Sequence, residues 1–251
     1  MTKKTLSDAA DGILVIDDLF SKESLDKIEL GFLDGYFPWH MGTSSYSKGD
    51  DGKIKFFSAT PVNDDFVPEV VEGPQLMHMF LKDGTVCSQN FNLIEFLLDT
   101  ISKNVDTHPY TMLGRVKANL QFKKDIPLNC YNTPHIDIVG DIGDEAASTA
   151  DHLIMIFYVN DADSDTVIFE NTSPPWKIKK SINSKRGRIV IFNGNLYHAG
   201  CHPRETEHRI VINFNFLNTL KYNFAAPPKL LIKNWYENWW NLWDNRKRYQ
   251  I

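Results

Sequence analysis

The sequence predicts a mainly β fold (α+β) of the sandwich or jelly-roll kind, with helices near its N-terminus. Two amphipathic helical patterns come first, and from about residue 113 the hydrophobic period changes to two. The later segments are short and are separated by turns rich in Gly, Asn, Asp and Pro, as in antiparallel β folds. Helices and strands do not alternate along the chain, which argues against a parallel α/β sheet.

The composition is typical of a globular protein. The chain has 251 residues, of which 42% are hydrophobic and 24% charged, enough for a sizeable core without a disulfide or a metal. A net charge of −5 argues against a general nucleic-acid binder. No apolar run has the length of a membrane span, and no signal-peptide pattern is present, so we expect a cytoplasmic protein. The three cysteines are widely spaced and predict no disulfide framework.

The N-terminal part predicts one strand and two helices. Residues 13–16 (ILVI) predict a short strand, and Ser21 is suited to cap a helix that ends near residue 34. Residues 36–75 are rich in Gly, Ser, Asp and Pro and predict an irregular segment, followed by a second helix at 89–104. The apolar faces of these helices comprise Leu25, Ile28 and Phe32 in the first, and Ile94, Leu97, Leu98, Ile101 and Val105 in the second.

Four later segments have the patterns of strands. Residues 115–122 and 208–216 alternate polar and apolar side chains, whereas 151–161 is nearly all apolar and predicts a strand covered on both faces. Residues 187–192 predict a further strand. The more polar faces of the two alternating strands comprise Arg115, Lys117, Asn119 and Gln121 on the first, and Arg209, Val211, Asn213 and Asn215 on the second.

These polar faces have two interpretations. An open sheet would turn them to water, which is the default for Arg115 and Lys117, with a substrate contact as the alternative for both. A small barrel with a polar interior would instead turn them inward, around a ligand. Periodicity alone does not decide between the two, and the motifs that follow favour the second.

A possible metal site begins at His135 and Asp137. They are two residues apart, so on a strand both side chains leave the same face. His198, just after the strand at 187–192, is the best candidate for a third ligand, and the chain in between leaves room for two or three strands. Two histidines and one carboxylate form the facial triad typical of non-haem Fe(II), which leaves other positions on the metal open.

The remaining histidines fit this site less well. His202 lies in a polar turn, where we expect it to be exposed, and His208 faces the other side of its strand from the neighbouring Arg209. For the histidines outside the expected β core we predict loop or surface positions. These are His40, His78 and His108.

Arg209 follows His198 by a turn and one strand, on the polar face of 208–216. Arginine is permanently charged and binds a carboxylate through two N–H donors. A metal with open positions and a buried arginine nearby predict a dicarboxylate co-substrate, with one end on the metal and the other on the guanidinium.

With these motifs in place, residues 113–217 resemble the 2-oxoglutarate- and Fe(II)-dependent oxygenases, specifically the prolyl-4-hydroxylase-like branch. FPWHMG (37–42) is similar to phage-encoded members of the superfamily. The resemblance rests on the order of four segments: His135-Ile136-Asp137, IFYVND (156–161), GRIVIFNGNLYHAG (187–200) and HRIVINF (208–214).

The resemblance implies a single oxygenase domain over 1–251, with N-terminal helices and entrance loops (1–112), a double-stranded β-helix core (113–217) and a C-terminal extension (218–251). It implies roles for individual side chains as well. His135, Asp137 and His198 would bind iron, Arg209 would bind the distal carboxylate of 2-oxoglutarate, and Tyr158 would help to hold it. The tyrosine that the branch often has on the strand before the HxD motif is absent, and Asn119 or Gln121 is the candidate substitute.

The implied activity is that of a hydroxylase that couples 2-oxoglutarate decarboxylation to oxidation of a substrate C–H bond. It would require Fe(II), 2-oxoglutarate and O2, with ascorbate as a candidate reductant and a peptidyl residue as one candidate substrate. Asp137 argues against the halogenating variation, which lacks this carboxylate. The alternatives are a non-catalytic jelly-roll module that binds a small acid or sugar, and a zinc hydrolase, which the placement of Arg209 and the lack of a general-base motif disfavour.

The C-terminal segment predicts an aromatic helix at 234–249, because Trp235, Trp239 and Trp243 recur every four residues. We expect this face to pack over the barrel or the N-terminal helices of a monomer, with a dimer contact or a substrate cover as the alternatives.

Overall fold

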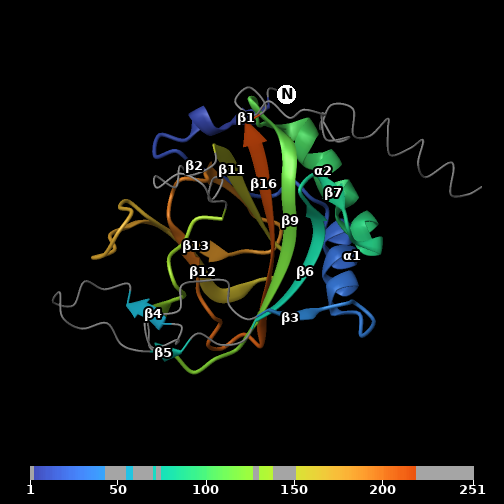
Figure 1. The fold of residues 1–251 in the computed structure, drawn as a ribbon. Helices are drawn as coiled ribbons and strands as arrows, with labels where there is room; N and C mark the ends of the chain where they lie inside the picture. Colours follow the sequence, from blue (N-terminus) through green and yellow to red (C-terminus); the bar gives the residue numbers. More distant parts are fainter. Residues whose placement is uncertain are drawn as a thin grey trace, which may run out of the picture.

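The computed structural model describes residues 3–42, 55–58, 70–71, 75–126, 130–137 and 151–218 (Figure 1). The predicted aromatic helix at 234–249 lies outside these residues. No helix within them is long and apolar enough to cross a bilayer.

The helices are η1 (Leu6–Asp8), α1 (Lys22–Leu33), η2 (Gln89–Phe91) and α2 (Asn92–Asn104), where η marks a 3-10 helix. The strands are β1 (Lys4–Thr5), β2 (Ile13–Ile16), β3 (His40–Gly42), β4 (Lys55–Ser58), β5 (Val70–Val71), β6 (Gln75–Lys82), β7 (Thr85–Val86), β8 (Val105–Asp106), β9 (Tyr110–Phe122), β10 (Cys130–Tyr131), β11 (His152–Tyr158), β12 (Ala162–Phe169), β13 (Ile178–Ser184), β14 (Ile189–Asn193), β15 (His198–Gly200) and β16 (His208–Asn218).

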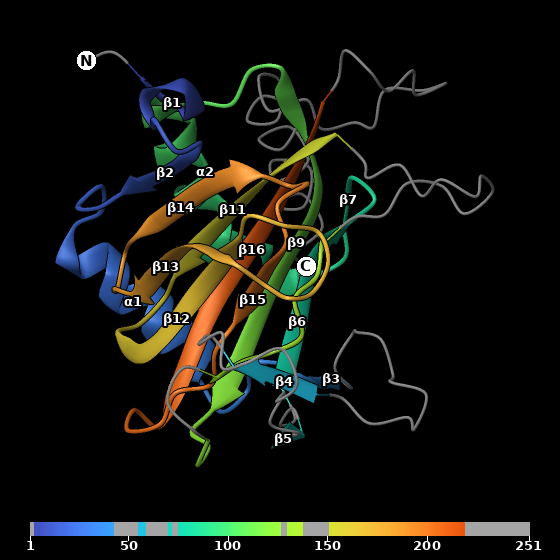
Figure 2. The same cartoon turned by 90° about the vertical axis from the view of Figure 1, so that its left-hand side faces the viewer.

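Two antiparallel sheets face one another as in a jelly roll, so the mainly β fold that the sequence predicts is confirmed. The larger sheet has eight strands in the order β2-β14-β11-β16-β9-β6-β3, with β7 beside β6. The smaller sheet has the order β13-β12-β15. Figure 2 shows this smaller sheet in front of the larger one. Apolar side chains of β11, β12 and β13, including Ile154, Ile168 and Ile182, pack together between the two sheets.

The helices cover the opposite face of the larger sheet (Figure 1). Ser21 caps α1 as expected, because its Oγ accepts a hydrogen bond from the Ser24 N–H at 3.2 Å. The buried faces of α1 and α2 share one apolar cluster with alternate residues of β9, β11 and β16. Strand β11 is buried along its whole length, so the prediction of a strand covered on both faces is confirmed. Burial of these apolar faces is the main contribution to the stability of the fold.

The sequence-based expectation misses several strands. The segment expected to be irregular, 36–75, contains β3, β4, β5 and the first residue of β6 in its described part. Four strands, β11 to β14, lie between Asp137 and His198 in the described residues, rather than two or three. The predicted surface position of His78 is also wrong. It lies on β6 with 5% of its surface exposed, and its Nε2 is 2.7 Å from Ser88 Oγ.

Candidate metal centre

The register between β9 and β16 builds one wall of a pocket. Arg209 lies opposite Gln121, and Asn213 lies opposite Lys117. Because strand side chains alternate, the polar residues of both strands share the face that is turned away from the helices. The inward interpretation of the two polar faces is therefore confirmed. The pocket is lined by Gln75, Lys117, Asn119, Gln121, Asn132, His135, Asp137, Ile156, Thr166, His198, Gly200, Arg209, Val211 and Asn213.

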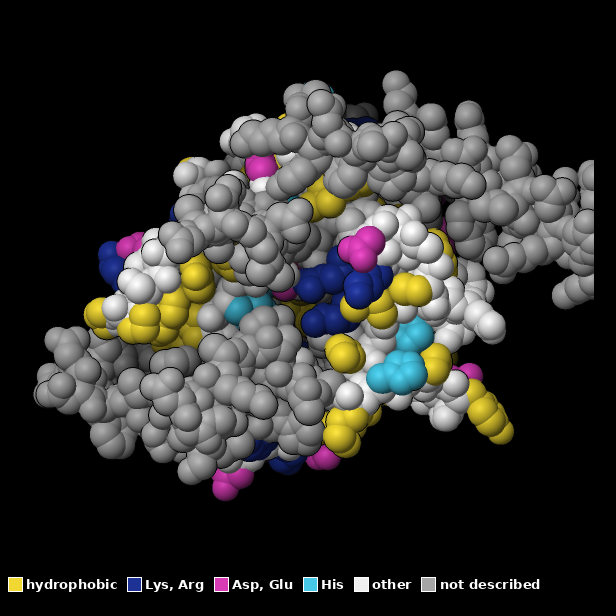
Figure 3. Space-filling view, in the orientation of Figure 1, with side chains coloured by type: hydrophobic (Ala, Val, Ile, Leu, Met, Phe, Trp, Pro, Cys, Tyr) yellow, Lys and Arg dark blue, Asp and Glu magenta, His cyan; other side chains and the backbone are white. Residues whose placement is uncertain are grey.

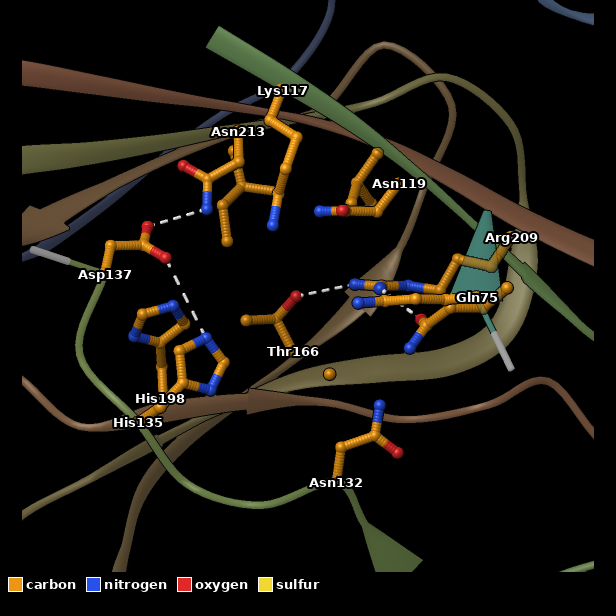
Figure 4. Close-up of a pocket in the computed structure, with 14 residues that line it drawn as sticks. Gln75, Lys117, Asn119, Asn132, His135, Asp137, Thr166, His198, Arg209 and Asn213 are labelled. Carbon is orange, nitrogen blue, oxygen red and sulfur yellow. Dashed lines mark hydrogen bonds and ion pairs between the residues drawn. The ribbon is translucent and has the colours of Figure 1, made fainter. Parts of the chain in front are cut away.

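An isolated β-bridge brings the two histidines of the predicted triad together. The backbone N–H of His135 donates to the carbonyl of His198, and the reverse bond is also formed, both at 3.0 Å. The two imidazole rings then lie 4.6 Å apart between centroids. Asp137 follows on the same side, and one ligand atom from each of the three residues lies within 4.8 Å of the others. Figure 4 shows all three side chains converging on one point of the pocket.

Both histidines have the state that a metal ligand requires. The Nδ1 of His135 lies 3.0 Å from the Thr133 carbonyl, and that of His198 lies 3.3 Å from the Leu196 carbonyl. In these contacts Nδ1 is the donor, so Nε2 is the ring nitrogen of each histidine that would bind a metal. Burial lowers the pKa of His135 to about 3 and also lowers that of His198, so both rings are neutral at physiological pH. This donor set fits a divalent ion.

Asp137 is held ionised and in a fixed orientation. Its carboxylate is 2% exposed, and its Oδ1 forms an ion pair with Arg115 Nη2 at 2.7 Å. Its Oδ2 accepts hydrogen bonds from the side-chain amides of Asn213 and Asn215, at 2.7 and 2.8 Å. Burial raises the pKa of this carboxyl, whereas the charge of Arg115 and the hydrogen bond from Asn215 lower it, and the pKa lies well below its usual range. The default of a solvated strand edge is therefore wrong for Arg115.

Arg209 lies at the other end of the pocket, 4% exposed. Its Nη1 donates to Gln121 Oε1 at 3.0 Å, its Nη2 to Thr166 Oγ1 at 2.8 Å, and its Nε to Ser184 Oγ at 2.9 Å. All these partners are neutral, and no carboxylate of the described residues forms an ion pair with the guanidinium. A buried arginine without an acidic partner is costly unless an anionic ligand compensates it.

Tyr158 is not among the residues that line the pocket. It is fully buried behind Arg209, whose Cζ lies 5.5 Å from the centre of the tyrosine ring. Its hydroxyl donates to Thr166 Oγ1 at 2.7 Å. Thr166 accepts from both Tyr158 and Arg209, so its own proton remains available for a ligand in the pocket. The pattern of residues 162–169 does not predict a strand, so Thr166 was not among the predicted site residues.

Three further side chains of the pocket have no hydrogen-bond partner at a buried polar atom within the described part of the chain. The Oδ1 atoms of Asn119 and Asn132 are buried and accept no hydrogen bond from any described residue. Lys117 is 8% exposed, points into the pocket (Figure 4) and forms no hydrogen bond or ion pair with any described residue. The default of a solvated edge is wrong for Lys117 too. The expected exposure of His202 is also wrong, since it is 3% exposed with its Nδ1 3.0 Å from the Phe122 carbonyl.

Comparisons by sequence find no relative: no family model matches the chain, and no curated protein does. Comparisons by structure, in contrast, find similar proteins. An oxidoreductase of the 2OG-Fe(II) oxygenase family from Burkholderia pseudomallei superposes with a TM-score of 0.55. The match covers 87% of this chain and 96% of that one, at 10% sequence identity. The chain has the fold of the 2OG-Fe(II) oxygenases. The resemblance drawn from the sequence motifs is thereby confirmed at the level of the fold.

Two other solved structures are similar to this chain at lower TM-scores. A prolyl hydroxylase from Trichoplax adhaerens, in complex with a peptide of hypoxia inducible factor, has a TM-score of 0.49 and 11% identity and matches over 86% of this chain and 88% of that one. HygX from Streptomyces hygroscopicus, with nickel, 2-oxoglutarate and hygromycin B bound, has a TM-score of 0.48 and 11% identity and matches over 82% and 83%.

Proposed function

We propose that the chain is an Fe(II)/2-oxoglutarate-dependent dioxygenase that hydroxylates a substrate C–H bond. One observation carries the proposal. A His-Asp-His donor set and a buried arginine, with no carboxylate partner among the described residues, lie at two ends of one pocket. This is the arrangement that a metal ion and a dicarboxylate together require.

His135, Asp137 and His198 would hold Fe(II). Together with 2-oxoglutarate and O2, the iron would supply the oxidising power that no side chain has. Arg115, Asn213 and Asn215 keep the Asp137 carboxylate ionised and correctly oriented. Such outer contacts raise metal affinity without touching the metal.

Arg209 would bind the distal carboxylate of 2-oxoglutarate. Gln121, one of the two residues suggested for the missing tyrosine, orients the guanidinium through its Oε1. Thr166 would donate its free proton to the same carboxylate, and Tyr158 would act only by fixing Thr166 and packing on Arg209. Asn119 lines the pocket and would contact whichever ligand fills it. We assign these residues to one oxygenase domain.

The experiment measures succinate formed from 2-oxoglutarate in air with Fe(II) and ascorbate, together with a search by mass spectrometry for a gain of one oxygen in added peptides, nucleotides and amino acids. We expect 2-oxoglutarate-dependent succinate in the wild type and in His108→Ala, an exposed-histidine control, but not in Asp137→Ala or His198→Ala. Equal succinate in all four proteins would leave the non-catalytic jelly-roll module as the better account.

A further inference from the structure

The pocket holds a cation that the proposed chemistry does not use. Lys117 lies on β9, two residues beyond Arg115 and on the same face, with its ammonium group directed into the cavity (Figure 4). Arg115 is neutralised by Asp137, and Arg209 is assigned to the distal carboxylate of 2-oxoglutarate. Lys117 is left with no hydrogen-bonded or ionic partner among the described residues. A buried, unpaired ammonium group is rare because its desolvation is not repaid.

The charges of the filled pocket are also unbalanced. Arg115, Lys117 and Arg209 carry three positive charges, and a divalent ion adds two. Asp137 and the two carboxylates of 2-oxoglutarate supply three negative charges. Within the part of the chain that the structure describes, the site therefore keeps an excess of two positive charges. Lys and Arg side chains also gather near the middle of the face that Figure 3 presents. An excess of this size in a partly closed cavity favours a ligand of opposite charge.

A second buried group lies beside the lysine. Asn119 is two residues further along β9, on the same face, and its buried Oδ1 accepts no hydrogen bond from the residues that the structure describes. A cation and an unpartnered amide side by side can bind an anionic group and an adjacent polar group of one small molecule.

We propose that Lys117 binds an anionic group, a carboxylate or a phosphate, of the substrate that is oxidised, with Asn119 beside it as a polar contact. This inference rests on the proposed function, since it takes the metal and 2-oxoglutarate to occupy the triad and Arg209. It narrows the substrate to small acids, phosphate esters or acidic residues of a larger molecule. Lys117 determines specificity and does not take part in the chemical step.

The test uses the full chain loaded with Ni(II) and saturating 2-oxoglutarate, so that no turnover occurs. The Tm is followed while sodium acetate or inorganic phosphate is added, with acetamide and sodium chloride at matched ionic strength as neutral and salt controls. A ligand of the loaded protein raises the Tm in a saturable way. A compound that only competes with saturating 2-oxoglutarate adds almost nothing. The acetate and phosphate arms distinguish a carboxylate from a phosphate as the preferred group.

We expect a saturable rise with acetate or phosphate in the wild type and in Lys103→Met, which removes an exposed lysine on α2. In Lys117→Met the apparent affinity for that anion should be weaker by roughly tenfold or more. An equal response in Lys117→Met and wild type, or no anion response in a wild type that binds 2-oxoglutarate, overturns the inference. Loss of 2-oxoglutarate binding in Lys117→Met also overturns it, because Lys117 would then belong to the co-substrate site. A wild type that binds no 2-oxoglutarate contradicts the proposed function itself.

Discussion

The two faces of the β9–β16 pair are built from the same strands and behave in opposite ways. On the helix-covered face, Ala118, Ile212 and Phe214 are all fully buried in one apolar cluster. On the pocket face, Lys117 and Arg209 line a cavity whose single described carboxylate, Asp137, forms an ion pair with Arg115. The first face stabilises the fold, whereas the second places buried polar groups where ligands can compensate them. Because side chains alternate along a strand, neighbouring residues of β9 and β16 serve either the stability of the fold or the binding of a ligand.

The largest effect should come from the helix-covered face. Phe214→Ala removes a fully buried ring and should lower the free energy of unfolding by roughly 3–5 kcal/mol. Urea denaturation followed by circular dichroism measures it. The neighbouring Asn213→Ala, whose side chain faces the pocket, should cost far less stability while weakening metal binding. Equal losses of stability for the two variants would mean that the faces are not separate in this way.

The next largest effect should come from removing Arg209, the residue proposed to bind the distal carboxylate of 2-oxoglutarate. Arg209→Ala should weaken 2-oxoglutarate binding by roughly 10- to 150-fold, the range expected for a charge-assisted pair worth about 1.5–3 kcal/mol. Arg209→Lys should be milder, since the charge stays but the two-pronged geometry is lost. Calorimetric titration of the metal-loaded protein provides the comparison, with metal affinity as the internal control. Identical 2-oxoglutarate isotherms for wild type and Arg209→Ala would assign the anchor to another residue.

A slightly smaller effect should come from Arg115, which contacts the metal ligand Asp137 but would not contact the metal itself. Arg115→Gln should reduce metal affinity by about 10- to 100-fold. Loss of the guanidinium also raises the pKa of Asp137, since Arg115 is the strongest influence that lowers it. Metal affinity should therefore start to fall at a higher pH in the variant than in the wild type as the solution is acidified. If both proteins lose the metal at the same pH, Arg115 does not control the ionisation of Asp137.

The smallest effect concerns a buried histidine on the helix-covered side. Burial lowers the pKa of His78 below its ordinary value of 6.5, so the unfolded chain binds a proton at a pH where the folded chain does not. Stability from this group is complete above about pH 6.5 and is lost as the pH falls, by at most about 1.4 kcal/mol per pH unit. His78→Gln should flatten that acid-side slope, and His108→Gln at an exposed site should not. If the free energy of unfolding falls with equal slope on acidification in wild type and His78→Gln, burial does not lower the pKa of His78.

The sequence predicted the parts that periodicity controls. The alternation of 208–216 placed Arg209, Asn213 and Asn215 on one face, and the structure confirms that arrangement. The triad could be proposed because His135 and Asp137 are two residues apart and His198 follows a clear strand. What periodicity cannot supply is the partner across the cavity. The ion pair between Asp137 and Arg115 depends on strand register and on the loop that carries Asp137. The same holds for Lys117, which has no partner among the described residues. A local pattern predicts neither.

The missed strands have physical reasons. β12 contains Asp163 and Asp165 and has a register shift between Ala162 and Asp165, which breaks the period of two. β13 is rich in Lys, Ser and Asn, because much of one face remains exposed, so it lacks the apolar alternation of a core strand. Thr166 was not predicted as a site residue because its strand, β12, was not predicted. Its hydroxyl is nevertheless among the best-placed donors of the pocket.

The most direct test of the central claim is the binding of Fe(II) and 2-oxoglutarate to the pocket in the absence of O2. The account predicts one Fe(II) per chain and, when 2-oxoglutarate is added, a weak visible absorption band that is absent in Asp137→Ala and requires far more 2-oxoglutarate in Arg209→Ala. A wild-type protein that binds neither, or a band that survives unchanged in Asp137→Ala, would contradict it.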